Sequence, residues 1–328
     1  MGAHNPVKVE AGDRNSYRPE SHKRKENVMG SLLDKLVSRS LATPPPFLKN
    51  NVHYEVLMGS VAYGVSSDTS DMDVYGFCIP PKHIIFPHLN GEILGFGRNK
   101  ERFEQYQQHH IKDKESRKEY DITIYNIVKY FSLCMENNPN MIDSLFVPRR
   151  CILHSTQIGE YVREHKKEFL HKGSWFKFKG YAYSQLHKMR TKRPEEDSRR
   201  YESVQEHGYD LKFAYHLVRL LNEIEQILIE HDLDLERNRE QLKSIRRGEW
   251  EKEQIEEYFE KKEKELETIY TNSTLPHSPN EDKIKTILLN ALEMHYGSLD
   301  GAIEVNVPVE TILNDMSAYI EKVRKALK

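Results

Sequence analysis

The sequence predicts an α+β protein, with strands in its first half and helices in its second. Between residues 50 and 153, short apolar runs with strand-like spacing are separated by turn formers. After about residue 155, apolar residues recur almost everywhere at helical spacing. Apolar residues make up 38% of the 328 positions, which is enough for one or two hydrophobic cores of ordinary size.

The elements follow in order along the chain. Residues 1–30 are polar without any periodicity, and we expect a flexible arm. A helix then begins with Ser31 as its N-cap and ends before the three prolines at 44–46. We predict strands at 52–58, 72–79 and 120–125, and helices at 126–136, 155–169, 174–190, 208–231, 239–247, 250–272 and 283–296. The shift in period divides the chain into a catalytic domain at 31–153 and a helical domain at 154–328.

The charge and the cysteines exclude several classes of protein. Lys and Arg total 49 against 51 Asp and Glu, so the chain is neither a uniformly basic nucleic-acid coat nor an acidic disordered tail. No stretch is apolar enough for a signal peptide or a membrane span, and we expect a cytoplasmic protein that does not enter membranes. Cys78, Cys134 and Cys151 lack metal or disulfide spacing, and they are expected as buried apolar residues.

The stretch 56–64 suggests a phosphate site. An apolar strand runs into Gly59 and Ser60, where backbone N–H groups and a hydroxyl could converge on one anion. Tyr63 is expected to pack beneath this turn rather than to stack on a base.

Asp71 and Asp73 follow on the next strand and suggest a magnesium site. Residues two apart on a strand project from the same face, so both carboxylates point to one place. The alternative is a simple turn, because residues 66–71 are rich in loop formers. Asp121, which opens the strand at 120–125, is the expected third acid, with Glu119 as the alternative. We expect His109 and His110 on a surface loop, away from any ligand role.

These residues resemble those of a known family. Gly59-Ser60, Asp71-Met-Asp73 and Asp121 in this order are similar to the hallmark of polymerase β-like nucleotidyltransferases. The stretches at 62–64, 70–73, 121–123, 138–140 and 207–212 resemble the branch associated with RNA repair, the RlaP or YcgL-like proteins. The resemblance spans about residues 50–300, while the segment between Ile79 and Tyr120 has no counterpart in the family pattern. It implies a small mixed sheet, a helical second domain, an NTP donor and two Mg²⁺ ions, for which Mn²⁺ could substitute.

The helix at 208–231 carries an ordered polar stripe. Lys212, His216, Arg219 and Glu223 fall on one face, opposite a stripe of leucines and isoleucines. If this face lines the cleft, Lys212 and Arg219 would hold phosphates, and His216 would hydrogen-bond a phosphate or the sugar. If it faces water, the same residues are ordinary surface neighbours.

The sequence therefore predicts a nucleotidyltransferase that moves an NMP from an NTP, with ATP or CTP expected, to a hydroxyl and releases pyrophosphate. The expected acceptor is an RNA end, because residues 172–188 mix lysines with aromatic rings. A small molecule, a protein hydroxyl, or a non-catalytic nucleotide or RNA sensor with the same fold are the alternatives.

Overall fold

A computed structural model describes residues 30–66, 71–93, 95, 97, 102–192 and 199–298, together with 317, 320, 324 and 325. Five strands form one mixed sheet in the order β3-β4-β2-β1-β5. Their bounds are Val52–Leu57 (β1), Met72–Cys78 (β2), Gln105–Asp113 (β3), Lys118–Asn126 (β4) and Ile152–Ser155 (β5). Only β2 and β4 run parallel, whereas the other neighbouring pairs are antiparallel.

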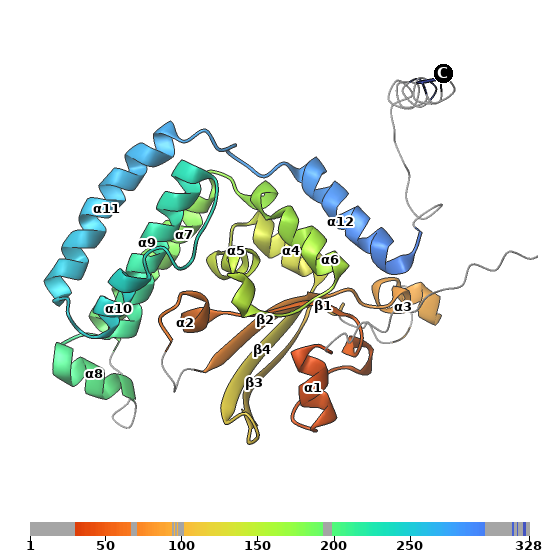
Figure 1. Ribbon diagram of the computed structural model, residues 1–328, viewed down its shortest axis with the longest axis horizontal. Helices are drawn as coiled ribbons and strands as arrows, with labels where there is room; N and C mark the ends of the chain where they lie inside the picture. The colour runs from red at the N-terminus through yellow and green to blue at the C-terminus, as the bar shows by residue number, and fades with distance from the viewer. Residues whose placement is uncertain are drawn as a thin grey trace, which may run out of the picture.

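The two faces of the sheet are covered by different helices. On one face, Val74 of β2 and Ile122 of β4 pack against Leu33 and Leu36 of α1 (Leu32–Ser38). On the other, Phe77 of β2 belongs to the main core with α4 (Ile127–Met135) and α5 (Pro139–Phe146). Figure 1 shows α1 below the sheet and α4, α5 and α6 (Gln157–Glu164) above it.

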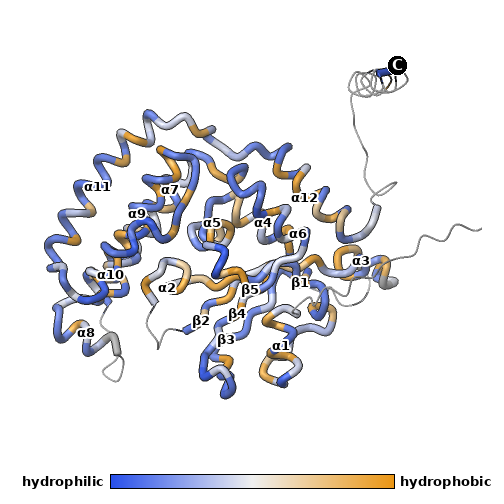
Figure 2. Tube along the Cα trace, viewed as in Figure 1, coloured by the Kyte–Doolittle hydropathy of each residue, from blue (hydrophilic) through white to orange (hydrophobic). Residues whose placement is uncertain are grey.

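Five of the later helices gather beside the sheet, whereas α12 (Glu281–Tyr296) lies apart from them and packs on α6 and α4 (Figure 1). The five are α7 (Ser174–Thr191), α8 (Arg199–His207), α9 (Leu211–Glu230), α10 (Arg239–Arg246) and α11 (Lys252–Asn272). Almost the whole middle of α9 is buried, because α7, α10 and α11 all pack on it. The outer helix α11 is largely hydrophilic (Figure 2) and buries only Ile255, Phe259 and Leu266.

Most predicted elements are confirmed within a few residues. The Ser31 side chain caps α1, Asn126 caps α4, and the predicted helices from 155 onward correspond to α6, α7, α9, α10, α11 and α12. Unpredicted elements are the strands β3 and β5, the helices α5 and α8, the short helix α3 (Lys82–Ile85) and the 3₁₀ turns. The expected arm at 1–30 lies outside the described residues except for Gly30. All three cysteines are buried and unpaired, as expected.

One continuous core joins the strands to the helices. Its buried members range from Tyr54 of β1 through Ile142 of α5 to Ala291 of α12. The division at 153–154 into two domains stays a prediction. Within the described part of the chain, no helix is both long and apolar enough to cross a membrane.

Glu55, in the middle of β1, is a buried carboxyl that holds the first turn of α1. Its oxygens accept the backbone N–H groups of Leu32 at 2.5 Å and Leu33 at 3.0 Å. Burial raises the pKa of Glu55 to about 7, although these two hydrogen bonds act in the opposite direction. The folded protein therefore retains a proton that the unfolded chain releases, and this carboxyl's contribution to stability should fall as the pH rises from about 4.5 to about 7.

The Glu55→Gln variant should remove this part of the pH dependence, which is on the order of 3 kcal/mol for a shift of this size. Urea unfolding of both proteins at pH 5 and pH 8 gives the change in the free energy of unfolding with pH for each. The difference between the two changes measures the contribution of Glu55, because the other titrating groups contribute equally to both proteins. The same change in unfolding free energy with pH in the two proteins would contradict this role of Glu55.

Candidate active site

The parallel pairing of β2 with β4 places two of the predicted acids side by side. Asp73 is the register partner of Asp121, and residues paired in this way project from the same face of the sheet. Asp71 lies just before β2 and is exposed. Within the described residues, no group of three or more acidic, imidazole or thiol side chains is gathered closely enough to hold a metal ion. The acids are thus brought together as one pair with a third charge nearby.

Asp73 is half-buried and has other charged side chains nearby. Burial raises the pKa of this carboxyl, and the neighbouring charges of Asp121 and Asp71 raise it further. Lys212 and His109 act in the opposite direction, since positive charge stabilises the carboxylate. The site therefore concentrates negative charge at a partly desolvated position.

The Gly59 turn lies directly against Asp73. The short helix α2 (Gly59–Ala62) begins with Gly59 at φ +63°, a left-handed conformation that favours glycine. A Cβ atom at this position would come within 2.4 Å of Asp73 Oδ2, so the turn and the carboxylate can approach this closely only because residue 59 has no side chain. The backbone N–H of Met58 also donates to the carbonyl of Asp73 at 2.7 Å. The turn predicted to bind phosphate therefore lies side by side with Asp73, one of the predicted acids.

The N-terminus of α9 reaches the same place. Asp210 caps the helix by accepting the N–H of Lys212 at 2.8 Å, and the exposed Lys212 is close enough to lower the pKa of Asp73. His216, one turn further along, is half-buried and lies against the ring of Tyr215, with 4.1 Å between the centroids.

Arg219 requires a correction. Its side chain is only 5% exposed and forms ion pairs with Asp143 of α5 and with Glu223, both of which are buried. A guanidinium engaged in this way is not available to a phosphate, so the predicted phosphate-binding role is not supported by the geometry. The polar stripe on α9 runs from the site at Lys212 into the protein interior rather than along an open cleft.

Arg219 instead joins the turn to the helices. Tyr63, at the end of the turn, is 2% exposed, donates its hydroxyl to Asp143 Oδ2 at 2.8 Å, and has its ring 4.3 Å from the Arg219 guanidinium. Tyr63 therefore packs beneath the turn, as expected. Burial raises the pKa values of Asp143 and Glu223, although the positive charge of Arg219 acts in the opposite direction.

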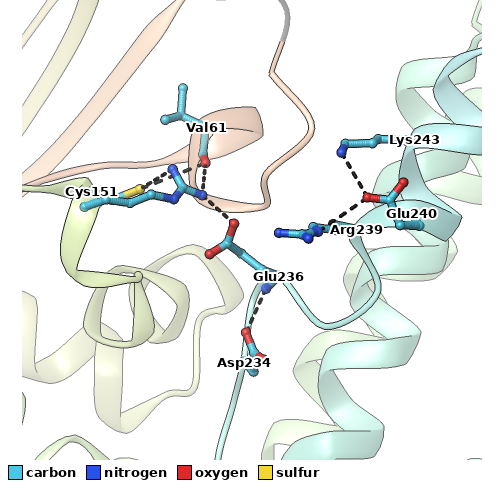
Figure 3. A network of polar contacts seen from close by, with 8 residues as sticks. Val61, Cys151, Asp234, Glu236, Arg239, Glu240 and Lys243 are labelled. Atoms are coloured by element: carbon cyan, nitrogen blue, oxygen red, sulfur yellow. Dashed lines mark hydrogen bonds and ion pairs between the residues drawn. The ribbon is translucent and has the colours of Figure 1, made fainter.

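A second link holds the far end of the turn (Figure 3). Arg150 donates to the carbonyl of Val61 at 3.0 Å and to Glu236 Oε1 at 2.7 Å. Glu236 lies on the segment before α10, and Arg246 at the end of α10 donates to the carbonyl of Val65. The turn is therefore held by residues from both halves of the chain.

Two histidines lie beside the acids, a position that could not be predicted from the sequence. His109 and His110 lie on β3, not on a surface loop, at a bulge where the register with β4 shifts. The N–H of His110 donates to Asp121 Oδ1 at 2.8 Å, and His109 Nδ1 lies 3.4 Å from Asp121 Oδ2. Glu119, the alternative third acid, has its Oε1 atom 2.6 Å from His110 Nδ1, so its side chain interacts with His110. Two adjacent histidines in a polar run are the only signal in the sequence, and they do not show which strand will pair with theirs.

The lysine and aromatic segment at 172–188 divides between core and surface. Trp175 and Phe178 are buried, and Tyr183 donates its hydroxyl to Glu263 of α11. Tyr181 is 38% exposed and accepts from Asn138 Nδ2 at 3.2 Å. Burial raises the pKa of Tyr75, two residues after Asp73, and the nearby Tyr181 adds to this shift. An exposed ring of α7 thus lies near the face of the sheet that carries the acids.

A solved structure and a family model are similar to this chain. A nucleotidyltransferase-like protein from Exiguobacterium sibiricum 255-15, known from a crystal structure, aligns over 79% of this chain and 72% of its own, at 9% identity. The TM-score of this alignment is 0.27. No curated protein matches the chain. The model of the RlaP family, described as the RNA repair pathway DNA polymerase beta family, matches residues 33–292. Since this match covers most of the chain, the protein belongs to the RlaP family of polymerase β-like nucleotidyltransferases.

Proposed function

We propose that the protein transfers an NMP group from an NTP, ATP or CTP, to an acceptor hydroxyl and releases pyrophosphate. Family membership implies nucleotidyl transfer in general. The observation that carries the specific proposal is the position of Asp73, which is paired with Asp121 on one side and lies against Gly59 on the other. This arrangement brings acids for a metal next to a turn for phosphates.

The pair Asp73 and Asp121, with Asp71 nearby, fits magnesium. Mg²⁺ is usually bound in proteins by one or two carboxylates together with substrate phosphates and water, so a closed cage of protein ligands is not needed. Burial raises the pKa of Asp73, the charges of Asp121 and Asp71 raise it further, and a bound cation would relieve the repulsion among these carboxylates. When bound, Mg²⁺ or Mn²⁺ would lower the charge on the transferring phosphoryl group and polarise the attacking hydroxyl, and we propose two such ions.

The chain's own residues would bind and orient the donor. The backbone at Gly59 and the Ser60 hydroxyl would hold the β- and γ-phosphates, with Lys212 as the nearby cation. His216, on the next turn of α9, would form a hydrogen bond with the sugar or with a phosphate of the donor. The two networks around Tyr63 and Arg150 would keep the turn aligned with Asp73, and alignment of this kind supplies much of the acceleration in phosphoryl transfer.

We propose an RNA end as the acceptor. The family description names an RNA repair pathway, and the exposed Tyr181 and Lys188 of α7 are suited to stacking and to phosphate contact. A small-molecule or protein hydroxyl would use the same acids. A non-catalytic sensor is disfavoured, because a module that only binds nucleotides has no use for adjacent carboxylates that repel each other. That the protein works in the cytoplasm stays a prediction from the sequence.

Incubation of the purified full-length protein with each α-labelled NTP, total RNA and Mg²⁺ or Mn²⁺ tests the proposal. Label should enter RNA, with release of pyrophosphate, for ATP or CTP. Pyrophosphate release with label in a small molecule or in protein would identify one of the other acceptors. No release with any NTP and either metal would contradict nucleotidyl transfer and favour a sensor.

A further inference from the structure

Three exposed polar side chains of β3 form a row beside the acids. Gln105 and Gln107 are register partners of Tyr125 and Thr123 on β4, and these two β4 residues share a face with Asp121. Gln105 Nε2 donates to Gln107 Oε1 at 3.4 Å, and Gln107 Nε2 contacts His109 Nε2 at 2.7 Å. His109 in turn faces Asp121. We call Gln105, Gln107 and His109 the β3 row.

The β3 row and the phosphate turn flank the acids on opposite sides. In the sheet order, β3 lies beyond Asp121 of β4, whereas the Gly59 turn follows β1 on the other side of Asp73. In phosphoryl transfer the attacking and leaving oxygens lie roughly in line on opposite sides of phosphorus. If pyrophosphate leaves on the turn side, the acceptor hydroxyl therefore approaches from the side of the β3 row.

From this geometry, and resting on the proposed function, we infer that the β3 row binds the sugar of the acceptor's terminal nucleotide. Amide groups can donate and accept hydrogen bonds, as ribose hydroxyls also do. A neutral row suits a sugar better than a phosphate, for which arginine and lysine are the usual ligands. The inferred ligand is a ribonucleotide end with adjacent 2′ and 3′ hydroxyls, and the 2′-hydroxyl is the group that distinguishes RNA from DNA.

The bulge in β3 holds the row against the acid pair. The backbone at His110 has a φ of +56°, and its N–H donates to Asp121 Oδ1. Because an amide nitrogen can only donate, the contact from Gln107 makes His109 Nε2 the acceptor. His109 Nδ1 then carries the ring proton and points it toward Asp121 Oδ2. A sugar bound by Gln107 would therefore be held at a fixed position relative to Asp121, because His109 links the two side chains.

The test compares two RNA oligonucleotides that differ only in a 2′-hydroxyl or a 2′-deoxy group on the terminal nucleotide. Wild-type protein should use the ribose end with a kcat/KM at least about tenfold higher, a typical effect of one or two hydrogen bonds. In Gln107→Ala, the KM for the ribose-ended RNA should rise about tenfold, the KM for NTP should not change, and the preference should fall to near one. Gln107 is exposed, so this variant should fold normally.

Gln157→Ala is the matched control. It makes the same chemical change at an exposed glutamine just after β5, at the opposite edge of the sheet, and should keep the wild-type preference. Binding of both RNAs is measured in parallel without NTP, and wild type should bind the ribose end more tightly than Gln107→Ala does.

Each outcome bears on one of the two proposals. A wild type that binds the ribose end selectively but transfers nothing contradicts the proposed function while it supports the row. A wild type without preference in transfer or binding, or a Gln107→Ala variant with the wild-type preference, overturns the row while transfer itself stands.

Discussion

Asp73→Asn should reduce nucleotidyl transfer by about a thousandfold or more while the protein stays folded. Asparagine keeps the shape of the side chain but removes the charge that lies beside Asp121 at the proposed metal position. A metal ion contributes several kcal/mol to the transition state, and each 1.36 kcal/mol corresponds to a factor of ten in rate. Burial and the charges of Asp121 and Asp71 disfavour the ionised form of the Asp73 side chain. A neutral asparagine at this position should therefore leave the melting temperature of the protein unchanged or raise it.

Single-turnover transfer from an α-labelled NTP, with a melting curve for each protein, measures both effects. Asp71→Asn should also abolish transfer, whereas Asp282→Asn, an equivalent change at a residue on α12 that is 98% exposed, should leave both activity and melting unchanged. Substantial transfer by purified Asp73→Asn would refute the assignment of this carboxylate.

Arg219→Met should destabilise the fold by about 3–5 kcal/mol, the usual cost of breaking a buried ion pair by removing one partner. Methionine preserves most of the volume but leaves Asp143 and Glu223 in the interior without their cation. Tyr63 would lose the guanidinium against its ring, so transfer should also fall in any protein that remains folded.

Denaturant unfolding measures this cost against Arg237→Met. Arg237 pairs with Glu230 at the surface, where both side chains are 43% exposed, and exposed pairs contribute about 1 kcal/mol or less. If Arg219 were instead a phosphate ligand with no structural role, its variant would unfold like Arg237→Met and lose affinity for NTP alone.

The elements that the sequence predicted well are those with a strong apolar period. The alternation in β2 and the leucine stripe of α9 are local features, and both elements were located within a few residues. β3 was missed because its exposed residues are glutamines and histidines and its stability comes from pairing with β4. An edge strand of this composition has no local signal that distinguishes it from a polar loop.

The candidate site also contains positions that local sequence patterns could predict and one that they could not. The proximity of Gly59, Asp73 and Asp121 could be predicted, because the spacing of small and acidic residues along strands fixes the direction of their side chains. The burial of Arg219 could not be predicted, because it depends on Asp143, which lies 76 positions earlier on another helix. A charged residue on a polar stripe is normally assigned to solvent, and only the fold shows that this stripe turns inward.

The unbroken core from β1 to α12 limits how this enzyme can admit its substrates. Proteins that close by a hinge motion need a weakly packed interface between two rigid domains. Here Phe77 of the sheet, Ile142 of α5 and Leu217 of α9 share one apolar interior, and a hinge between them would expose it to water. On the proposed function, access would therefore be controlled at the rim, by individual side chains such as Lys212 and Tyr181, so selectivity among acceptors would evolve by substitution at the entrance rather than by changes in the scaffold.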